Sequence, residues 1–284
     1  PLMEAAALKG LLRPFDDLTQ IQLATDWYPY AHELARLQSS TFGLPFAGDA
    51  LLLAYAPGSE QSAPFTWDET IQITGTLAFP ASDPQALFPL SLYLAAGGAI
   101  LDEQGRPVLD PGTLTTVLEF LAQAERAGSL PYWIMQHETM DESWEAFTQG
   151  QVNHTLSWSS RYLSPAVNPD SGVQVALLPA PSQTSFTLIT GWVWALPATQ
   201  PTRQGLSAQL AEYLVDSTFL VQWAEAAGYI PTRSAALASW SQPEMRTLVE
   251  QIATIARPYP PADVLLAIGP ALKQATLDIL TRQL

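Results

Sequence analysis

The stretch TFGLPFAGDALLLAY, residues 41–55, holds two short apolar runs separated by a Gly-Asp pair. Apolar runs of this length that are bounded by turn residues are typical of buried strands. Glycine and aspartate favour tight turns, because glycine adopts positive φ and the aspartate side chain bonds to nearby backbone. The stretch therefore predicts a strand, a break at Gly48 and Asp49, and a second strand.

A second apolar stretch, TGWVWALP at residues 190–197, places two tryptophans two residues apart. Residues i and i+2 of an extended segment point to the same face, so Trp192 and Trp194 present their indole rings side by side. Such a pair either fills a core or forms a platform for a flat ligand.

Helical patterns alternate with strands along the chain. Residues Leu2–Leu12 and Tyr28–Leu37 have helical patterns, and Thr66 with Glu69 predicts a capping box at the start of a short helix. A long helix is predicted around residues 114–121, where apolar residues recur at helical spacing. Strands that alternate with helices predict an α/β fold.

The composition excludes several classes of function. Among 284 residues there are 12 Lys and Arg against 27 Asp and Glu, so the net charge is −15. An acidic chain without a basic cluster repels phosphate backbones and anionic lipids, which argues against nucleic acid and membrane surfaces as partners. Apolar runs stay below the roughly 18 residues of a membrane span, so we expect no direct membrane insertion of this chain. The absence of cysteine excludes disulfides and thiol chemistry.

Eight segments, taken in order, make the chain resemble the extracellular solute-binding proteins of ABC importers, in particular the sugar-binding, maltose-binding-protein-like family. The resemblance covers nearly the whole chain, although no single motif is specific. One segment, WAEAAGYIPTRSAAL, is similar to the family's WAEAGGYLPVRKSAL. The others are LLRPFDDL, FGLPFAGDALLLAY, FTWDE, AAGGAILDEQGRPVLD, AFTQGQVNHTLSWSSRYL, VALLPAP and TGWVWALP.

This resemblance implies an α/β, periplasmic-binding-protein-like (type II) fold, with two lobes joined by crossover strands and a ligand cleft between the lobes. Lobe 1 is expected to contain residues 1–47 and 191–235, and lobe 2 residues 48–190 and 236–284. The family's first strands, about 80 residues, and its signal peptide and lipid-anchor cysteine have no counterpart in this sequence. We therefore expect lobe 1 to be truncated at its N-terminus. If the chain starts at Pro1, the apolar face left open should favour association or an altered lobe.

The function that the resemblance implies is capture of a carbohydrate, of oligosaccharide size, and its delivery to the permease subunits of an ABC transporter. The location would be the periplasm or the cell surface, where a lipid anchor on a preceding segment would hold the protein. No cofactor and no metal is expected. A pyranose has an apolar face that an indole can cover and a rim of hydroxyls that Asp and Arg groups can bind.

Three candidate ligand contacts lie in two of these eight segments, and the one that contains Asp49 resembles the family's first crossover between lobes. Asp49 is either a turn residue or, as the resemblance implies, a cleft carboxylate that accepts sugar hydroxyls. Trp158 belongs either to the core or to a strand end that opens to solvent, where its ring would stack on a sugar. Arg161 is either a surface charge or a donor to hydroxyls.

The other candidates lie later in the chain. Tyr229 follows a helix in GYIPTR, and its match to the family favours the cleft rim. Arg233 either ties this loop down or binds the ligand. Trp192 is expected to be the sugar platform nearest the cleft, and Trp194 the packing beneath it. Aromatic residues within helical patterns are assigned to packing; these are Trp67, Phe88, Tyr93, Trp144 and Trp223.

A carbohydrate-active enzyme of the glycoside hydrolase type is one alternative, and a non-transport interaction domain is another. Carboxylates for hydrolysis are available in Asp49, Asp141, Glu142 and Glu145, but no pattern predicts a pair at the roughly 5–10 Å that this chemistry requires. The motif HETMDE lacks the second histidine of a zinc helix, and there is no G-x-S-x-G elbow. We therefore expect binding without catalysis.

Overall fold

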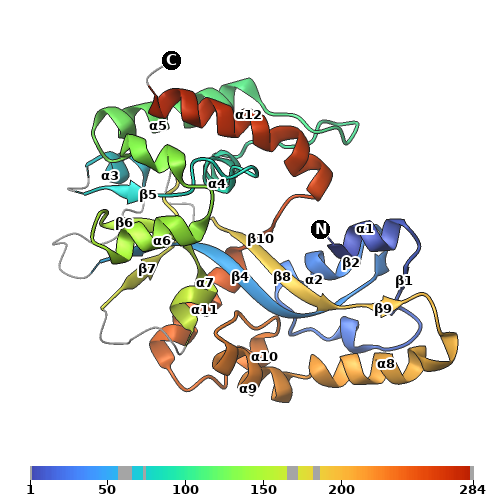
Figure 1. Ribbon diagram of the computed structural model, residues 1–284. Coiled ribbons are helices and arrows are strands. Elements are labelled where there is room, and N and C mark those ends of the chain that lie inside the picture. The colour runs from blue at the N-terminus through green and yellow to red at the C-terminus, as the bar shows by residue number, and fades with distance from the viewer. Residues whose placement is uncertain (1, 57–65, 73–74, 165–171, 182–185, 282–284) are drawn as a thin grey trace. The chain divides into compact units, whose positions relative to one another are not determined.

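The computed structural model describes residues 2–56, 66–72, 75–164, 172–181 and 186–281 (Figure 1). The chain forms two compact units. Unit 1 comprises residues 1–50, 159–167 and 188–259, and unit 2 comprises residues 51–158, 168–187 and 260–284. Both units combine strands with helices, as the α/β pattern predicted.

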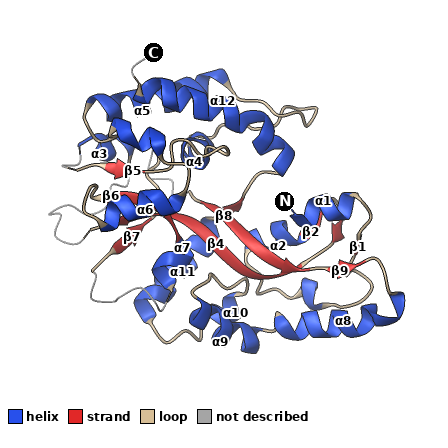
Figure 2. Cartoon of the chain, in the orientation of Figure 1, coloured by secondary structure: helices blue, strands red, loops and turns tan. Residues whose placement is uncertain are grey.

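The sheet of unit 1 is built on two long antiparallel strands, β4 (Leu44–Tyr55) and β8 (Leu188–Trp194), which Figure 2 shows in red. Gly48 pairs with Gly191 and Asp49 with Thr190, and the short strand β10 (Arg257–Pro258) runs parallel to β8. The predicted break at Gly48 and Asp49 is wrong, because β4 continues through both residues. The backbone of Gly48 also exchanges two hydrogen bonds with Ile230, of 2.8 and 2.9 Å, so the strand is held on both sides at this point.

Helix α2 (Pro29–Ala35) covers one face of this strand pair. A Cβ atom at Gly48 would lie 2.7 Å from the hydroxyl oxygen of Tyr30, and one at Gly191 would lie 2.7 Å from the carbonyl oxygen of Ala47. Glycine at both positions therefore allows the helix and the two strands to approach closely. The Tyr30 hydroxyl donates a 3.0 Å hydrogen bond to the carbonyl oxygen of Pro231, which fixes the helix in place.

The remaining elements of unit 1 are mostly helical. The predicted helix Tyr28–Leu37 ends earlier than expected, because Arg36 and Leu37 form strand β2 of a small hairpin. The other elements are α1 (Leu2–Leu8), β1 (Leu12–Arg13), η1 (Ile21–Leu23), β3 (Ser40–Thr41), α7 (Ser159–Leu163), β9 (Leu196–Pro197), α8 (Pro201–Leu214), α9 (Ser217–Ala227), α10 (Ser234–Leu237) and α11 (Pro243–Ile255).

In unit 2 the second half of β4 pairs with β6 (His154–Trp158) and β7 (Gln174–Ala176), and β6 pairs with β5 (Leu77–Ala78). Helices α5 (Pro111–Arg126) and α12 (Ala262–Leu280) lie side by side (Figure 1). The other helices are α3 (Trp67–Gln72), α4 (Leu87–Ala95), η2 (Tyr132–Gln136) and α6 (Met140–Thr148).

Two local predictions for unit 2 are confirmed. The capping box forms, because the Thr66 hydroxyl accepts a 3.3 Å bond from the Glu69 backbone and the Glu69 carboxylate accepts a 3.0 Å bond from the Thr66 backbone. The aromatic residues Trp67, Phe88 and Tyr93 are buried and pack in the core.

The bounds of the two units differ from the expected lobes at residues 48–50, 159–167, 188–190 and 236–259, which belong to unit 1 instead of unit 2. The longest of these segments is 236–259. Helix α11 accounts for the difference in this segment, because the Tyr28 hydroxyl beside α2 donates a hydrogen bond to the Glu250 carboxylate. The identity of these units with lobes that close on a ligand stays a prediction.

His154 gives unit 2 a pH-dependent stability. The side chain is buried and stacks on Tyr55 at 6.2 Å between ring centres, and neither ring nitrogen has a hydrogen-bond partner among the described residues. Burial lowers the pKa of His154 below its usual 6.5. Just below pH 6.5 the ring is therefore neutral in the folded protein and protonated in the unfolded chain.

We expect the contribution of His154 to the free energy of unfolding to be constant above about pH 6.5 and to fall below it, by at most about 1.4 kcal/mol per pH unit. Urea titrations between pH 5 and 8 would measure the slope. His154→Phe, which keeps the ring stack, should reduce the slope, while His32→Gln, at an exposed position of α2, serves as the control. An equal slope in the His154→Phe variant would contradict this account.

A candidate ligand-binding surface in unit 1

The face of the β4–β8 pair opposite α2 presents a row of side chains. Ala47 lies directly across from Trp192, and Asp49 lies across from Thr190. Opposite residues of an antiparallel pair share a face, and neighbours along a strand alternate between faces. The side chains of Ala47, Asp49, Thr190, Trp192 and Trp194 therefore lie on the face that α2 leaves uncovered.

Five aromatic rings form a continuous surface on this part of unit 1. We call Phe46, Trp192, Trp194, Trp223 and Tyr229 the aromatic surface. Tyr229 contacts Trp192 edge-on at 5.0 Å and stacks on Trp223 at 5.9 Å. Phe46 contacts Trp223 at 5.2 Å and stacks on Trp194 at 4.6 Å. The chain of contacts thus runs from Trp192 to Trp194 through three intervening rings.

Both tryptophans of β8 are open to solvent. Trp192 is 42% exposed and Trp194 is 38% exposed. The prediction that Trp194 is the buried packing beneath Trp192 is therefore wrong. The register shift between Pro45 and Ala47 places Phe46 at an irregularity of β4, where its ring stacks on one side of Trp194 and leaves the rest of the indole exposed. The two tryptophans are similarly exposed, and the three rings between them come from β4, α9 and the loop after α9.

Tyr229 is held in place by its neighbours. Helix α9 ends at Gly228, whose φ of 73° is a conformation that favours glycine. A Cβ atom at Gly228 would lie 2.8 Å from the Cα atom of Ser164, so the loop also packs closely against the end of α7. Ile230, which directly follows Tyr229, pairs with Gly48. The chain on both sides of Tyr229 is thereby fixed to unit 1.

Asp49 is buried, with 5% of its surface exposed. Its carboxylate accepts hydrogen bonds from the Ser159 hydroxyl at 2.9 Å and from the Ser160 backbone N–H at 2.8 Å and hydroxyl at 2.7 Å. Burial raises the pKa of the Asp49 carboxyl, and the bonds from the two serines oppose this shift. The carboxylate is thus engaged by the start of α7.

Arg161 and Trp158 fall on either side of the point where the chain passes between units. Arg161 lies on α7 in unit 1, and Trp158 is the last residue of β6 in unit 2, where it pairs with Leu51. Both side chains are half-buried. Arg161 therefore shares a unit with Asp49 and the aromatic surface, whereas Trp158 belongs to the other unit.

Arg233 is buried and bound within unit 1. Its guanidinium donates two hydrogen bonds to the Asp26 carboxylate, at 2.9 and 2.6 Å, and one to the Val215 carbonyl oxygen at 3.3 Å. It also lies 5.1 Å from the ring centre of Trp27. These contacts favour the alternative that Arg233 ties down the loop after Tyr229.

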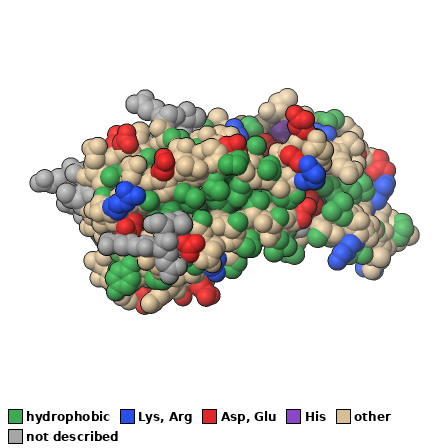
Figure 3. All heavy atoms as spheres, turned by 90° about the horizontal axis from the view of Figure 1, so that it is seen from above, with side chains coloured by type: hydrophobic (Ala, Val, Ile, Leu, Met, Phe, Trp, Pro, Cys, Tyr) green, Lys and Arg blue, Asp and Glu red, His purple; other side chains and the backbone are tan. Residues whose placement is uncertain are grey.

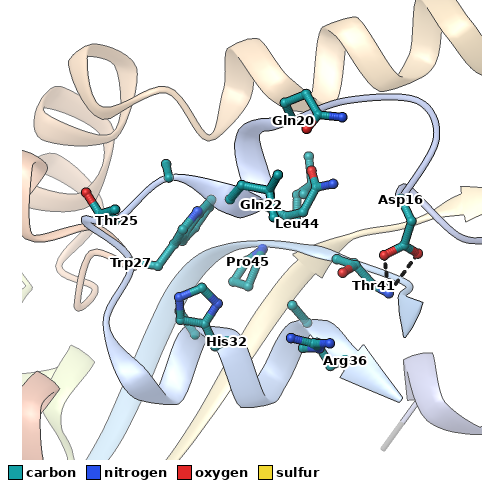
Figure 4. Close-up of a pocket in the computed structure, with 15 residues that line it drawn as sticks. Asp16, Gln20, Gln22, Thr25, Trp27, His32, Arg36, Thr41, Leu44 and Pro45 are labelled. Carbon is teal, nitrogen blue, oxygen red and sulfur yellow. Dashed lines mark hydrogen bonds between the residues drawn. The ribbon is translucent and has the colours of Figure 1, made fainter. Parts of the chain in front are cut away.

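A separate pocket of about 490 Å³ lies beside α2, between this helix, the start of β4 and the loop that carries Trp27 (Figure 4). Its walls combine polar and apolar residues, and Asp16 in the wall accepts hydrogen bonds from the Thr41 backbone at 3.0 and 3.3 Å. Its one indole, Trp27, is only 8% exposed. None of the six predicted ligand residues lines this pocket. Its polar lining is Asp16, Gln20, Gln22, Thr25, His32, Arg36 and Thr41.

Two observations concern the charged side chains of the described residues, and a third concerns the helices. On the face seen in Figure 3, Lys and Arg side chains are scattered rather than clustered. Within the described residues, no group of three or more His, Asp or Glu is arranged to hold a metal ion. No helix in that part of the chain is both long and apolar enough to cross a membrane.

The sequence patterns do not assign three members of the aromatic surface to it. Phe46 lies within a predicted apolar strand, and Trp194 and Trp223 are predicted to pack in the interior. A sequence signal for Trp223 is its position six residues before Tyr229, in a helix closed by glycine. Nothing comparable marks Phe46, since its position depends on the register shift of β4.

A comparison with protein families identifies the family of this chain. The model for the bacterial extracellular solute-binding protein family matches residues 2–247. The chain belongs to this family. Proteins of this extracellular solute-binding family are binding proteins rather than enzymes, and they act outside the cytoplasm. A search of curated proteins finds no match to the chain.

Solved structures of solute-binding proteins share the fold. The maltose-bound MalE3 of T. maritima aligns with a TM-score of 0.77 and 19% identity, over 100% of this chain and 78% of MalE3. MalE1 from L. casei BL23 aligns at 0.79 and 16% identity, over 99% and 77% of the two chains. A solute-binding protein from Thermotoga lettingae TMO, solved with α-D-tagatose, aligns at 0.77 and 21% identity, over 99% and 78%. The predicted α/β, type II periplasmic-binding-protein-like fold is confirmed.

Variants of Arg233 can show whether this residue stabilises the fold of this solute-binding protein or binds the ligand. Removal of one partner from a buried pair leaves an uncompensated charge, so Arg233→Ala should lower the free energy of unfolding by about 3 kcal/mol. Arg233→Lys should recover only part of the loss, because an ammonium cannot form the two parallel bonds to Asp26. Chemical denaturation would measure both. An Arg233→Ala variant that keeps its stability but loses ligand affinity would show a ligand role instead.

Proposed function

We propose that this solute-binding protein captures a carbohydrate outside the cytoplasmic membrane and delivers it to the permease of an ABC transporter. Family membership supports the transport role. The aromatic surface supports the carbohydrate, because solvent-exposed indole rings cover the C–H face of a pyranose. Similar structures were solved with maltose, with maltotetraose and with α-D-tagatose.

The aromatic surface is a better candidate for the sugar than the pocket beside α2. Trp192 and Trp194 expose large parts of their rings, whereas the indole of the pocket is buried. Residues two apart in a strand are separated by about 6.6 Å, a spacing comparable to that of successive sugar rings in an oligosaccharide. We therefore propose an oligosaccharide whose neighbouring units pack on Trp192 and Trp194, with Tyr229 beside the first.

The other predicted ligand residues are proposed to have two different roles. Trp158 and Arg161 remain proposed contacts, on the strength of the sequence pattern. Asp49 and Arg233 are proposed to support the site through their internal bonds. No turnover of the sugar is proposed, because family and structural neighbours are binding proteins.

Calorimetric titration with malto-, xylo- and cello-oligosaccharides tests the proposal. Trp192→Ala should weaken binding about tenfold, since loss of one stacking contact costs about 1.4 kcal/mol, with little change in melting temperature. Tyr213→Ala is the matched control, because this exposed aromatic residue of α8 lies outside the aromatic surface. No binding of any sugar, or an equal effect of the control, would contradict the proposal, and product release on incubation would contradict the absence of turnover.

Trp194 gives a test of ligand length. If successive sugar units lie on Trp192 and Trp194, Trp194→Ala should weaken the binding of a tetrasaccharide about tenfold and affect a disaccharide much less. The same calorimetric series measures both affinities. Equal losses for the short and the long ligand would rule out an extended arrangement along β8.

A further inference from the structure

Asp49 and the two serines that follow β6 form a hydrogen-bonded clasp within unit 1. The Asp49 carboxylate accepts three bonds from Ser159 and Ser160, as described above. The Ser159 hydroxyl also accepts a 3.0 Å bond from the Ala50 backbone N–H. Asp49, Ser159 and the backbone of Ala50 are buried, so these bonds form where water competes little.

The clasp determines where α7 begins. A helix of five residues is too short to be stable alone, because too few backbone bonds offset the cost of its first turn. Asp49 binds the first helical residues, and the close approach of Gly228 to Leu163 and Ser164 fixes the other end. Helix α7 is thus held between β4 and the loop that carries Tyr229.

We propose that Asp49 is a positioning residue, which holds α7 and its Arg161 beside the Tyr229 loop and does not itself contact the ligand. The family resemblance implied a direct bond from this carboxylate to sugar hydroxyls. Both carboxylate oxygens already accept bonds from serine, and only 5% of the residue is exposed. Little of the carboxylate is therefore accessible to a sugar hydroxyl.

The first test needs no ligand. The Ser160 backbone N–H donates to Asp49, so Asp49→Ala should speed its hydrogen exchange by about tenfold or more, as expected for the loss of one bond worth about 1.4 kcal/mol. Asp49→Asn should exchange almost as slowly as wild type, because the amide oxygen still accepts from Ser160 and its NH₂ can donate to the Ser160 hydroxyl.

Asp110→Ala is the matched control for this test. Asp110 accepts a 2.7 Å bond from the Thr113 backbone at the start of α5 in unit 2. Its removal should speed exchange at Thr113 and leave Ser160 unchanged. Slow exchange of Ser160 in the Asp49→Ala variant would overturn the proposal.

The second test rests on the proposed carbohydrate function. Asp49→Ala and Ser160→Ala should each weaken sugar binding, and the double variant should be no weaker than the poorer single one, because both act through α7. Asp49→Asn should retain most of the affinity. An Asn variant as weak as the Ala variant, or additive losses in the double variant, would show direct contact and overturn the proposal. If wild type binds no sugar, the proposed function fails, and hydrogen exchange still decides the role of Asp49.

Discussion

The backbone of Gly48 lies in contact with three other elements of unit 1, and their close packing requires a residue without a side chain at this position. Gly191 of β8 is its cross-strand partner, Ile230 bonds to it from the loop after α9, and Tyr30 of α2 lies against its Cα. Any Cβ atom there would come within 2.7 Å of the tyrosine hydroxyl. The absence of a side chain lets α2 seal one face of the strand pair, and the alternation of side chains along β8 places Trp192 and Trp194 on the other face. The position of the aromatic surface follows from this constraint.

The loop that contains Tyr229 shows how several weak restraints give one rigid position. Gly228 allows the helix to end with positive φ, Ile230 joins β4, and Arg233 anchors the far end to Asp26 and Trp27. These contacts order the loop before any ligand arrives. Preorganisation of this kind reduces the entropy lost on binding, so a stacking ring contributes more of its energy to affinity.

The sequence predicted those features that depend on nearby residues. The alternation of strands and helices, the capping box of Thr66 and Glu69 and the burial of Trp67 are local patterns, and the structure confirms them. The continuity of β4 through Gly48 could not be predicted in the same way. A Gly-Asp pair usually marks a turn, and here strand partners more than 100 residues away override that preference.

The candidate site was predicted less completely than the fold, for a related reason. The sequence identified Trp192 and Tyr229, but the rings that connect them to Trp194 come from other elements. The pairing of Arg233 with Asp26 spans 207 positions, so a sequence pattern could suggest only that the arginine fixes a loop. Phe46, whose ring stacks on Trp194, lies at a one-residue irregularity in β4, which hydrophobic patterning does not resolve.

The contacts among the aromatic rings also have an optical consequence. Three of the nine tryptophans lie within one connected set of rings, and Tyr229 lies between two of them at 5.0 and 5.9 Å. At such separations an excited tyrosine passes its energy to the neighbouring indoles, so the emission of this region comes from tryptophan. A molecule that binds to Trp192 or Trp194 replaces water around the emitting rings and shifts the wavelength of their fluorescence emission. The protein thus carries an intrinsic reporter for occupancy of its aromatic surface.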